Sequence, residues 1–315
     1  MSRPDSRLTV EFVDHKLISP LVLASGVLGT QAELMARVAE TGLGAVTTKS
    51  CGLEPRAGHP NPTVIAWEHG LLNAVGLTNP GVEKEVEEIS RLQRLLKKKK
   101  LKTKIIASFF GFSLEEYVKT VEQLVKAKPD FLEMNISCPN VASEAGEFFS
   151  ASSLSTYQLT KAVRKVIGKT PLIVKLSPNV TDIVSIAQAA CEGGADAICA
   201  INALLGMAID LESGKPILTN KIGGISGPAI KPLSIRCVYQ ISQVIKKPVI
   251  GLGGMSCAED VVEMVLAGAS LVGVGSAVYQ NGMEVFAQLN QDLSSYLKNK
   301  NIKSLTKLRG KAWKS

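Results

Sequence analysis

Short apolar runs alternate along this chain with longer stretches in which apolar residues recur every three to four positions. The short runs are rich in Val, Ile, Leu and Ala, which is typical of parallel strands buried on both faces. The pattern predicts strands at residues 20–25, 45–50, 104–110, 131–137, 171–177, 197–202, 248–254 and 271–276.

The stretches between these strands have a helical period. They predict helices within residues 30–42, 81–100, 113–127, 180–194 and 257–269. Several helical stretches end in Gly-Ala and run directly into the next strand, as C-capped helices before buried strands do. Eight strands over about 250 residues favour a single (β/α)₈ TIM barrel covering residues 1–315, with long βα loops at its C-terminal face. The main competitor, a doubly wound sheet, is disfavoured because no GxGxxG opens a helix after the first strand.

Composition and charge narrow the class of protein. The chain is 45% hydrophobic with 27 glycines, and no apolar run reaches the ~20 residues that span a bilayer. Its first residues contain acids and no apolar core, so we expect no signal peptide and a cytoplasmic location. The net charge of +8 is concentrated in residues 94–104 and 298–314. The first block ends a helix, where lysines are favoured, and neither block interleaves aromatics. Both therefore predict solvated surface, with no nucleic-acid or membrane partner.

The cysteines and histidines do not predict a metal site. Six cysteines and three histidines show no spacing suited to zinc or an iron–sulfur cluster. Four cysteines lie in apolar surroundings and are predicted to be small buried residues: Cys191, Cys199, Cys237 and Cys257. Cys138 differs, since it lies between Asn135 and Asn140 in "EMNISCPNV" at the exit of a strand.

Polar residues and glycines collect at the predicted strand ends. In a barrel these ends meet at one rim, and the loops at residues 51–82, 138–157 and 203–230 rise from the same side. The strand ends carry Ser25, Lys49, Ser50, Asn135, Lys175, Asn202, Gly253, Gly254, Gly275 and Ser276. Two lysines, several amides and two glycine turns together predict a site for a flat, polar, anionic ligand that carries a phosphate.

Each of these residues also has a plainer interpretation. The glycine turns can serve tight turns alone, although two of them at neighbouring rim positions favour phosphate binding by backbone N–H groups. Lys49 or Lys175 alone can extend to solvent, whereas two at equivalent ends favour partners for an anionic ligand. Asn73, in the uncharged stretch "LLNAVGLTNPG", is either part of a simple turn or the polar group of a specificity loop.

Cys138 has three interpretations. A buried inert thiol is disfavoured by its Asn and Pro neighbours, and a nucleophile would need a histidine base that no histidine obviously supplies. A general acid/base needs only a loop that brings the thiol over the ligand, with nearby lysines raising the thiolate fraction. The third interpretation fits best.

With these residues in view, the chain resembles the catalytic subunits of class 1 dihydroorotate dehydrogenases, which are FMN enzymes on a (β/α)₈ barrel. The resemblance runs from about residue 8 to about residue 290 and rests on "LASG", "TTKS", "LLNAVGLTNPG", "EMNISCPNV", "VKLSPNVTDI", "GLGGM" and "VGVGS". "LLGMAID" followed by "GGISGPAIKP" is similar to the B-type, whose catalytic subunit works with an iron–sulfur flavoprotein and passes electrons to NAD.

The resemblance implies a role for each matching residue. Cys138 would be the base that takes the C5 proton of dihydroorotate while hydride passes to the flavin. Substrate would be held by Lys49, Asn73, Asn135, Asn140 and Asn202. FMN would be held by Ser25, Lys49, Ser50, Asn135, Lys175, Ile201, Gly227, Gly253, Gly254, Gly275 and Ser276, the last four at its phosphate. FAD and a 2Fe-2S cluster would lie only on the partner subunit, and this chain would form a homodimer.

Two positions depart from the family pattern. Ala203 stands where a hydroxyl residue usually follows Asn202, which removes one expected hydrogen bond to the substrate. Ser108 stands where an asparagine facing the flavin is common. Three alternatives stay open here: an A-type enzyme using fumarate, a dihydropyrimidine dehydrogenase subunit, and a non-redox phosphate-binding barrel.

Overall fold

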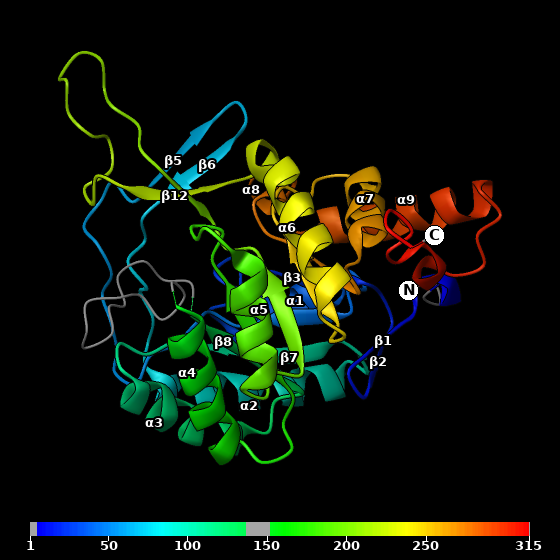
Figure 1. Ribbon diagram of the computed structural model, residues 1–315, viewed down its shortest axis with the longest axis horizontal. Coiled ribbons are helices and arrows are strands. Elements are labelled where there is room, and N and C mark those ends of the chain that lie inside the picture. The colour runs from blue at the N-terminus through cyan, green and yellow to red at the C-terminus, as the bar shows by residue number, and fades with distance from the viewer. Residues whose placement is uncertain (1–4, 137–151, 315) are drawn as a thin grey trace.

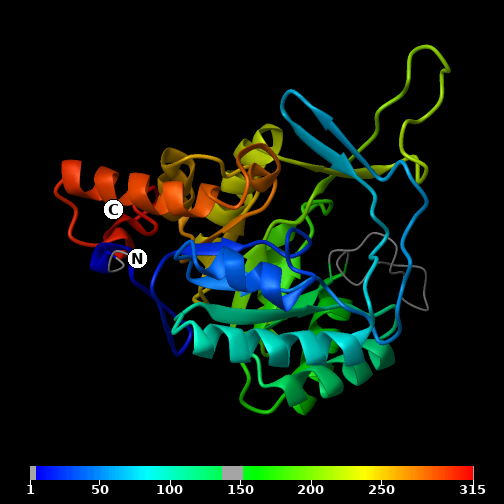
Figure 2. The same cartoon turned by 180° about the vertical axis from the view of Figure 1, so that it is seen from behind.

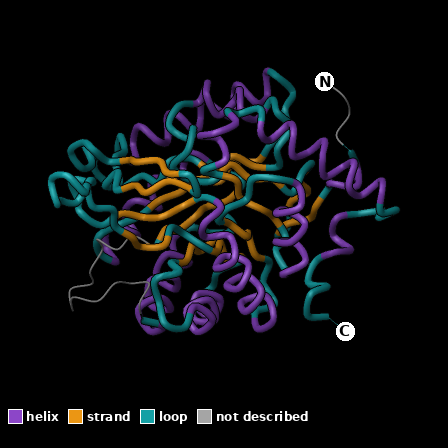
Figure 3. Tube along the Cα trace, turned by 90° about the horizontal axis from the view of Figure 1, so that it is seen from above, coloured by secondary structure: helices purple, strands orange, loops and turns teal. Residues whose placement is uncertain are grey.

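The computed structural model describes residues 5–136 and 152–314, and its centre is a closed barrel of eight parallel strands. Figure 3 shows the strands in the interior with helices around them. The barrel strands are β3 (Leu21–Leu23), β4 (Ala45–Thr47), β7 (Lys104–Phe109), β8 (Phe131–Asn135), β9 (Leu172–Leu176), β10 (Ala197–Ala200), β13 (Val249–Leu252) and β14 (Leu271–Val274). All eight predicted strands are confirmed, and β14 closes the barrel by pairing with β3.

Helices cover the outside of the barrel, and α1 and α2 pack side by side on the face seen in Figure 2. The helices are α1 (Ala32–Ala39), α2 (Val82–Lys98), α3 (Leu114–Leu124), α4 (Ser153–Val166), α5 (Ile183–Glu192), α6 (Lys231–Val244), α7 (Ala258–Ala267), α8 (Ala277–Asn281) and α9 (Val285–Asn299). Short 3-10 helices are η1 (Ser6–Leu8), η2 (Val125–Ala127), η3 (Pro228–Ile230) and η4 (Leu305–Leu308). Side chains define several helix starts: Ser113 accepts a hydrogen bond from the Glu116 N–H, and Asp182 accepts one from the Val184 N–H.

Apolar side chains fill the barrel interior in a layer to which every strand contributes. The layer is formed by Val22, Ala45, Ile106, Phe131, Ile173, Ala197, Cys199, Ile250 and Leu271. A small hairpin of β1 (Val10–Phe12) and β2 (His15–Leu17) adds Val10, Phe12 and Leu17 to this cluster. The rings of Phe12 and Phe131 meet edge to face at 5.6 Å, at the amino-terminal end of β8. The hairpin therefore closes the end of the barrel opposite the strand C-termini.

A second sheet, which the sequence pattern did not predict, is built from two of the long loops. It has the order β11-β12-β6-β5 and consists of β5 (Val64–Trp67), β6 (Gly70–Asn73), β11 (Leu204–Gly206) and β12 (Gly223–Ser226). Figure 1 shows this sheet, with the loop 207–222, extending beyond the barrel. Large apolar side chains on it are exposed, and Leu211 in the loop is 95% exposed.

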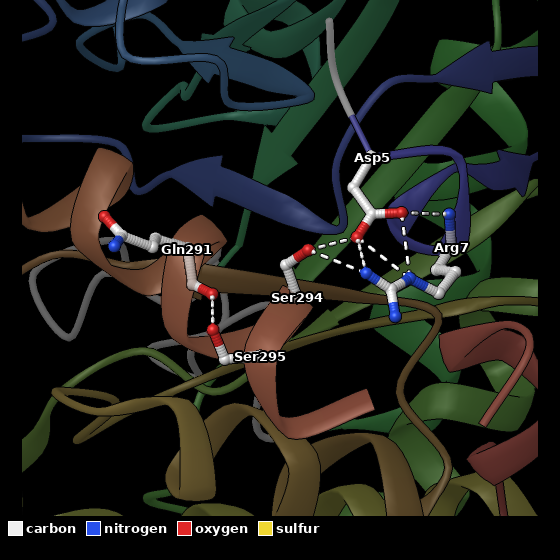
Figure 4. A network of polar contacts seen from close by, with 5 residues as sticks. All are labelled: Asp5, Arg7, Gln291, Ser294 and Ser295. Atoms are coloured by element: carbon white, nitrogen blue, oxygen red, sulfur yellow. Dashed lines mark hydrogen bonds and ion pairs between the residues drawn. The ribbon is translucent and has the colours of Figure 1, made fainter. Parts of the chain in front are cut away.

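The amino-terminal segment is attached to α9 by a polar cluster (Figure 4). Arg7 Nη2 lies 2.6 Å from Asp5 Oδ2, and the Ser294 hydroxyl donates to the same carboxylate. The hydrogen bond from Arg7 lowers the pKa of Asp5 to about 2, against the opposing effect of burial. The carboxylate therefore stays ionised at neutral pH.

Two predictions about surface properties can be compared with the structure. Within the described residues no helix is long and apolar enough to cross a membrane. Cys199 and Cys237 are buried as predicted, whereas Cys191 is half-buried and Cys257 is exposed. The prediction for Cys257 was wrong because this residue is the N-cap of α7, where the chain turns at the surface.

Candidate active site

A cavity of about 630 Å³ opens at the C-terminal ends of the barrel strands, beneath the second sheet. Every predicted site residue within the described chain lines it: Ser25, Lys49, Ser50, Asn73, Asn135, Lys175, Ile201, Asn202, Gly227, Gly253, Gly254, Gly275 and Ser276. Cys138 and Asn140 lie outside the described residues. The barrel thus gathers residues that are up to 251 positions apart, since parallel strands bring their C-termini to one rim.

Two lysines give the cavity its positive charge. Lys175, on β9, is only 4% exposed, and Lys49 follows β4. Burial lowers the pKa of Lys49, and the positive charge of Lys175 lowers it further. Among residues 5–136 and 152–314 neither lysine forms an ion pair, and the cavity wall contains no Asp or Glu. An anionic ligand would therefore be favoured, because it would offset the repulsion between the two ammonium groups.

Three of the predicted amides line the cavity from different elements. Asn73 Nδ2 donates to the Gly224 carbonyl at 3.2 Å, and Asn135 Nδ2 donates to Ser50 Oγ at 3.3 Å. The Asn202 N–H donates to the Leu176 carbonyl at 2.9 Å. Asn73 does not lie in a loop, as the sequence suggested, but ends β6, opposite Gly224 of β12. The second sheet therefore carries one of the predicted ligand-binding side chains.

A row of hydroxyl groups leads from the cavity wall into the barrel. Ser25 and Ser50 lie 3.1 Å apart at their Oγ atoms, and Ser50 lies 2.8 Å from Ser108. Ser108 Oγ donates to Glu133 Oε1 at 2.9 Å. Ser108, one of the two departures from the family pattern, thus joins the cavity wall to a buried carboxylate.

The glycine turns after β13 and β14 bring backbone close to the other end of the cavity. Gly254 has φ +80°, and a Cβ there would lie 2.8 Å from both the Gly227 carbonyl oxygen and Lys231 Cβ. Such a position accepts only glycine without a shift of the backbone.

Asp260 lies next to these turns as an ionised carboxylate. Burial alone would raise the pKa of Asp260, but the hydrogen bond from Lys231 at 2.7 Å, with others from Ser256 and Cys257, lowers this pKa to about 2. The ionised Asp260 ties this turn to the start of α7.

Several cavity residues were not identified from the sequence. His59 lines the cavity with its Nδ1 3.0 Å from the Ala74 carbonyl, and Asn179 Nδ2 donates to the Ala203 carbonyl at 3.0 Å. Asn179 Oδ1 also accepts from the Leu205 N–H, so this side chain holds the start of β11 over the cavity. Its position in "KLSPNV" at a strand end was the available signal. Ala203 lines the cavity and offers no hydroxyl group.

The described residues contain no group of three or more His, Cys, Asp or Glu side chains that could hold a metal ion. The arrangement is a cavity whose wall carries two lysines, several amides and the glycine turns after β13 and β14.

Comparison with known proteins gives one family. Residues 7–297 match the family model described as dihydroorotate dehydrogenase. A relative from Methanosarcina mazei is 43% identical over 98% of this chain and 96% of its own length. Relatives from Alkaliphilus metalliredigens, at 44%, and Pyrococcus abyssi, at 41%, cover 98% of this chain and 99% of their own lengths. All three carry the name dihydroorotate dehydrogenase B (NAD(+)), catalytic subunit.

Proposed function

Because this chain belongs to the dihydroorotate dehydrogenase family, we propose that it is the catalytic subunit of a B-type enzyme. It oxidises (S)-dihydroorotate to orotate in pyrimidine biosynthesis, with NAD as the final acceptor. The observation that carries the proposal is the gathering of all described family-type site residues on one cavity. The relatives' B-type names favour this function over the fumarate-using enzyme, the dihydropyrimidine dehydrogenase subunit and the non-redox barrel.

FMN is the cofactor that the cavity fits. When bound, it supplies the acceptor for the substrate hydride. Gly227, Gly253 and Gly254 line the cavity with positive φ, and a Cβ at each would clash with neighbouring protein atoms, so these turns require glycine. Glycine turns of this kind suit a phosphate held by main-chain N–H groups. We propose that Gly275 and Ser276 complete the phosphate site, and that Ser25, Ser50, Asn135, Lys175 and Ile201 hold the flavin ring. On this proposal residues 1–315 act as one FMN-binding domain.

The substrate is a flat anion, and the remaining cavity residues match its groups. Lys49 supplies the positive charge for the carboxylate, and Asn73, Asn135, Asn140 and Asn202 supply amide donors and acceptors for the ring. We propose that Lys49, which lines the same cavity, also contacts the flavin. Cys138 is the proposed base that removes the C5 proton, since a thiol brought over the lysine-lined cavity would have a raised thiolate fraction.

The relatives' names describe them as catalytic subunits, which implies a partner subunit for electron transfer. We propose that this partner carries FAD and a 2Fe-2S cluster, because the six cysteines of this chain show no spacing for a cluster. The chain itself would form a homodimer.

The direct test is anaerobic titration of the purified chain with dihydroorotate. We expect a yellow protein whose flavin absorbance is bleached stoichiometrically and restored by an oxidant. A colourless, fully folded protein that binds no FMN on reconstitution would overturn the proposal, and so would a bound flavin that dihydroorotate does not reduce.

A further inference from the structure

Glu133 is a buried acid to which the proposed reaction gives no role. It lies on β8 and is 3% exposed. It stands two residues before Asn135, so both side chains leave the strand on the same face. Asn135 lines the cavity, and Glu133 therefore lies one layer deeper in the barrel. A buried carboxylate is costly unless other groups compensate its charge.

The first compensation is a directed chain of hydrogen bonds. As a carboxylate, Glu133 can only accept, so the single proton of Ser108 Oγ is committed to it at 2.9 Å. Ser108 then accepts from Ser50 at 2.8 Å, and Ser50 accepts from Asn135 Nδ2 at 3.3 Å. The carboxylate thus sets the donor direction of every bond in the chain. Through it, the amide nitrogen of Asn135 is turned toward Ser50.

A second feature near Glu133 is the positive charge of Lys175, which lies on the neighbouring strand two residues beyond Ile173, the residue that Glu133 pairs with. Lys175 pairs with Cys199 across β9 and β10, and with Asn135 across β9 and β8. Burial raises the pKa of the Cys199 thiol, the negative charge of Glu133 raises it further, and the positive charge of Lys175 opposes both. Glu133 and Lys175 therefore act on the pKa of the same buried thiol in opposite directions. Glu133 is thus a buried acid beneath a wall that carries two lysines and, among the described residues, no Asp or Glu.

We propose that Glu133 is a positioning residue for the active site, acting through Ser108 and Ser50 on Asn135 and through its charge on the Lys175 region. The inference rests on the proposed function, because the readouts are bound FMN and orotate. The negative charge of Glu133 disfavours the anionic reduced flavin, and the hydrogen bonds that begin at Glu133 hold the Asn135 side chain in the orientation that binds the ligand. Ser108, which stands where the family resemblance leads one to expect an asparagine, is the middle link of this relay.

Two variants separate charge from orientation. Glu133→Gln keeps an oxygen acceptor for Ser108 but removes the charge. Ser108→Ala keeps the charge but interrupts the relay. Glu85→Gln is the control for the glutamate-to-glutamine replacement itself, because Glu85 is a second buried glutamate, 1% exposed, that does not line the cavity.

The experiment measures the FMN midpoint potential by spectroelectrochemistry and the orotate Kd by flavin spectral shift, on each holoenzyme. In Glu133→Gln we expect the flavin's reduced-to-oxidised ratio at fixed potential to rise about tenfold. For a two-electron couple this corresponds to a midpoint potential about 30 mV higher. In Ser108→Ala we expect orotate to bind about five- to tenfold more weakly, with a smaller change in potential. Glu85→Gln should change neither quantity.

The outcomes distinguish this inference from the proposed function. Suppose that Glu133→Gln binds FMN and that its reduced-to-oxidised flavin ratio at fixed potential lies within twofold of the wild-type ratio. That result overturns this inference and leaves the proposed function standing. If that variant does not fold, an unchanged orotate Kd in Ser108→Ala overturns it instead. A wild-type chain that binds no flavin overturns the proposed function, and this inference with it.

Discussion

Glu85 is a buried carboxyl group on α2 whose oxygens have no hydrogen-bond partner within the described chain. Burial raises its pKa to about 8, with the nearby Thr48 hydroxyl opposing the rise and Glu88 adding to it. Because the folded-state pKa lies above the ordinary value of 4.5, folding favours the protonated acid. Stability is therefore greatest below about pH 4.5 as far as this group is concerned, and declines as the pH rises toward 8.

Glu85→Gln should remove this decline. At pH 9 we expect the variant to be more stable than the wild type by about 3–5 kcal/mol, with little difference near pH 5. Urea unfolding at several pH values between 5 and 9 measures the effect. An unchanged pH dependence would show that Glu85 is solvated or paired in the folded protein.

Cys138 is the residue whose proposed role is most directly chemical. Cys138→Ser should retain FMN and orotate binding and lower turnover at pH 7 by about 10²–10⁴-fold, because a hydroxyl is a far poorer base than a thiol. Steady-state kinetics and the orotate-induced flavin spectrum provide the two measurements. Turnover close to the wild-type value at pH 7 would remove Cys138 from the mechanism.

At the scale of elements, the barrel strands were predictable because each is a continuous apolar run buried on both faces. The four strands of the second sheet were not, since none of them is a continuous apolar run buried on both faces. Their pairing is also non-local: Asn73 and Gly224, which lie opposite one another, are 151 residues apart. The periodicity of a strand's own sequence does not predict which distant segment will pair with that strand.

The turn after β13 can be tested through Gly254. Gly254→Ala should cost about 1–3 kcal/mol in backbone strain at φ +80°, and the clash with the Gly227 carbonyl should displace the turn. We expect FMN affinity to fall at least tenfold, measured by titrating FMN into the flavin-free protein.

Gly168→Ala is the control for this substitution. Gly168 also has a positive φ, at +57°, but a Cβ there would meet no atom within 4 Å. The control should lose some stability and keep its FMN affinity. Equal FMN affinities in the two variants would argue against a phosphate site at Gly254.

At the scale of the whole molecule, the proposed reaction needs a route for electrons beyond this chain. The purified chain should reduce its own flavin with dihydroorotate but form no NADH. NADH should appear, as absorbance at 340 nm, only after an iron–sulfur flavoprotein subunit of a B-type enzyme is added. NADH formation by this chain alone would contradict the proposed division of labour between subunits.

The sequence by itself determined the barrel and the set of residues at its rim. Buried parallel strands leave an apolar signature, and the residue after each strand must lie at one end of the barrel. The roles that the sequence assigned to those residues remain predictions.

Only the tertiary structure decided that Asn73 lies on a second sheet, that Cys257 is exposed at a helix start, and that Ser108 joins the cavity wall to Glu133. These features depend on contacts between segments distant along the chain. Side-chain hydrogen bonds and burial follow from such contacts, and local sequence patterns do not encode them.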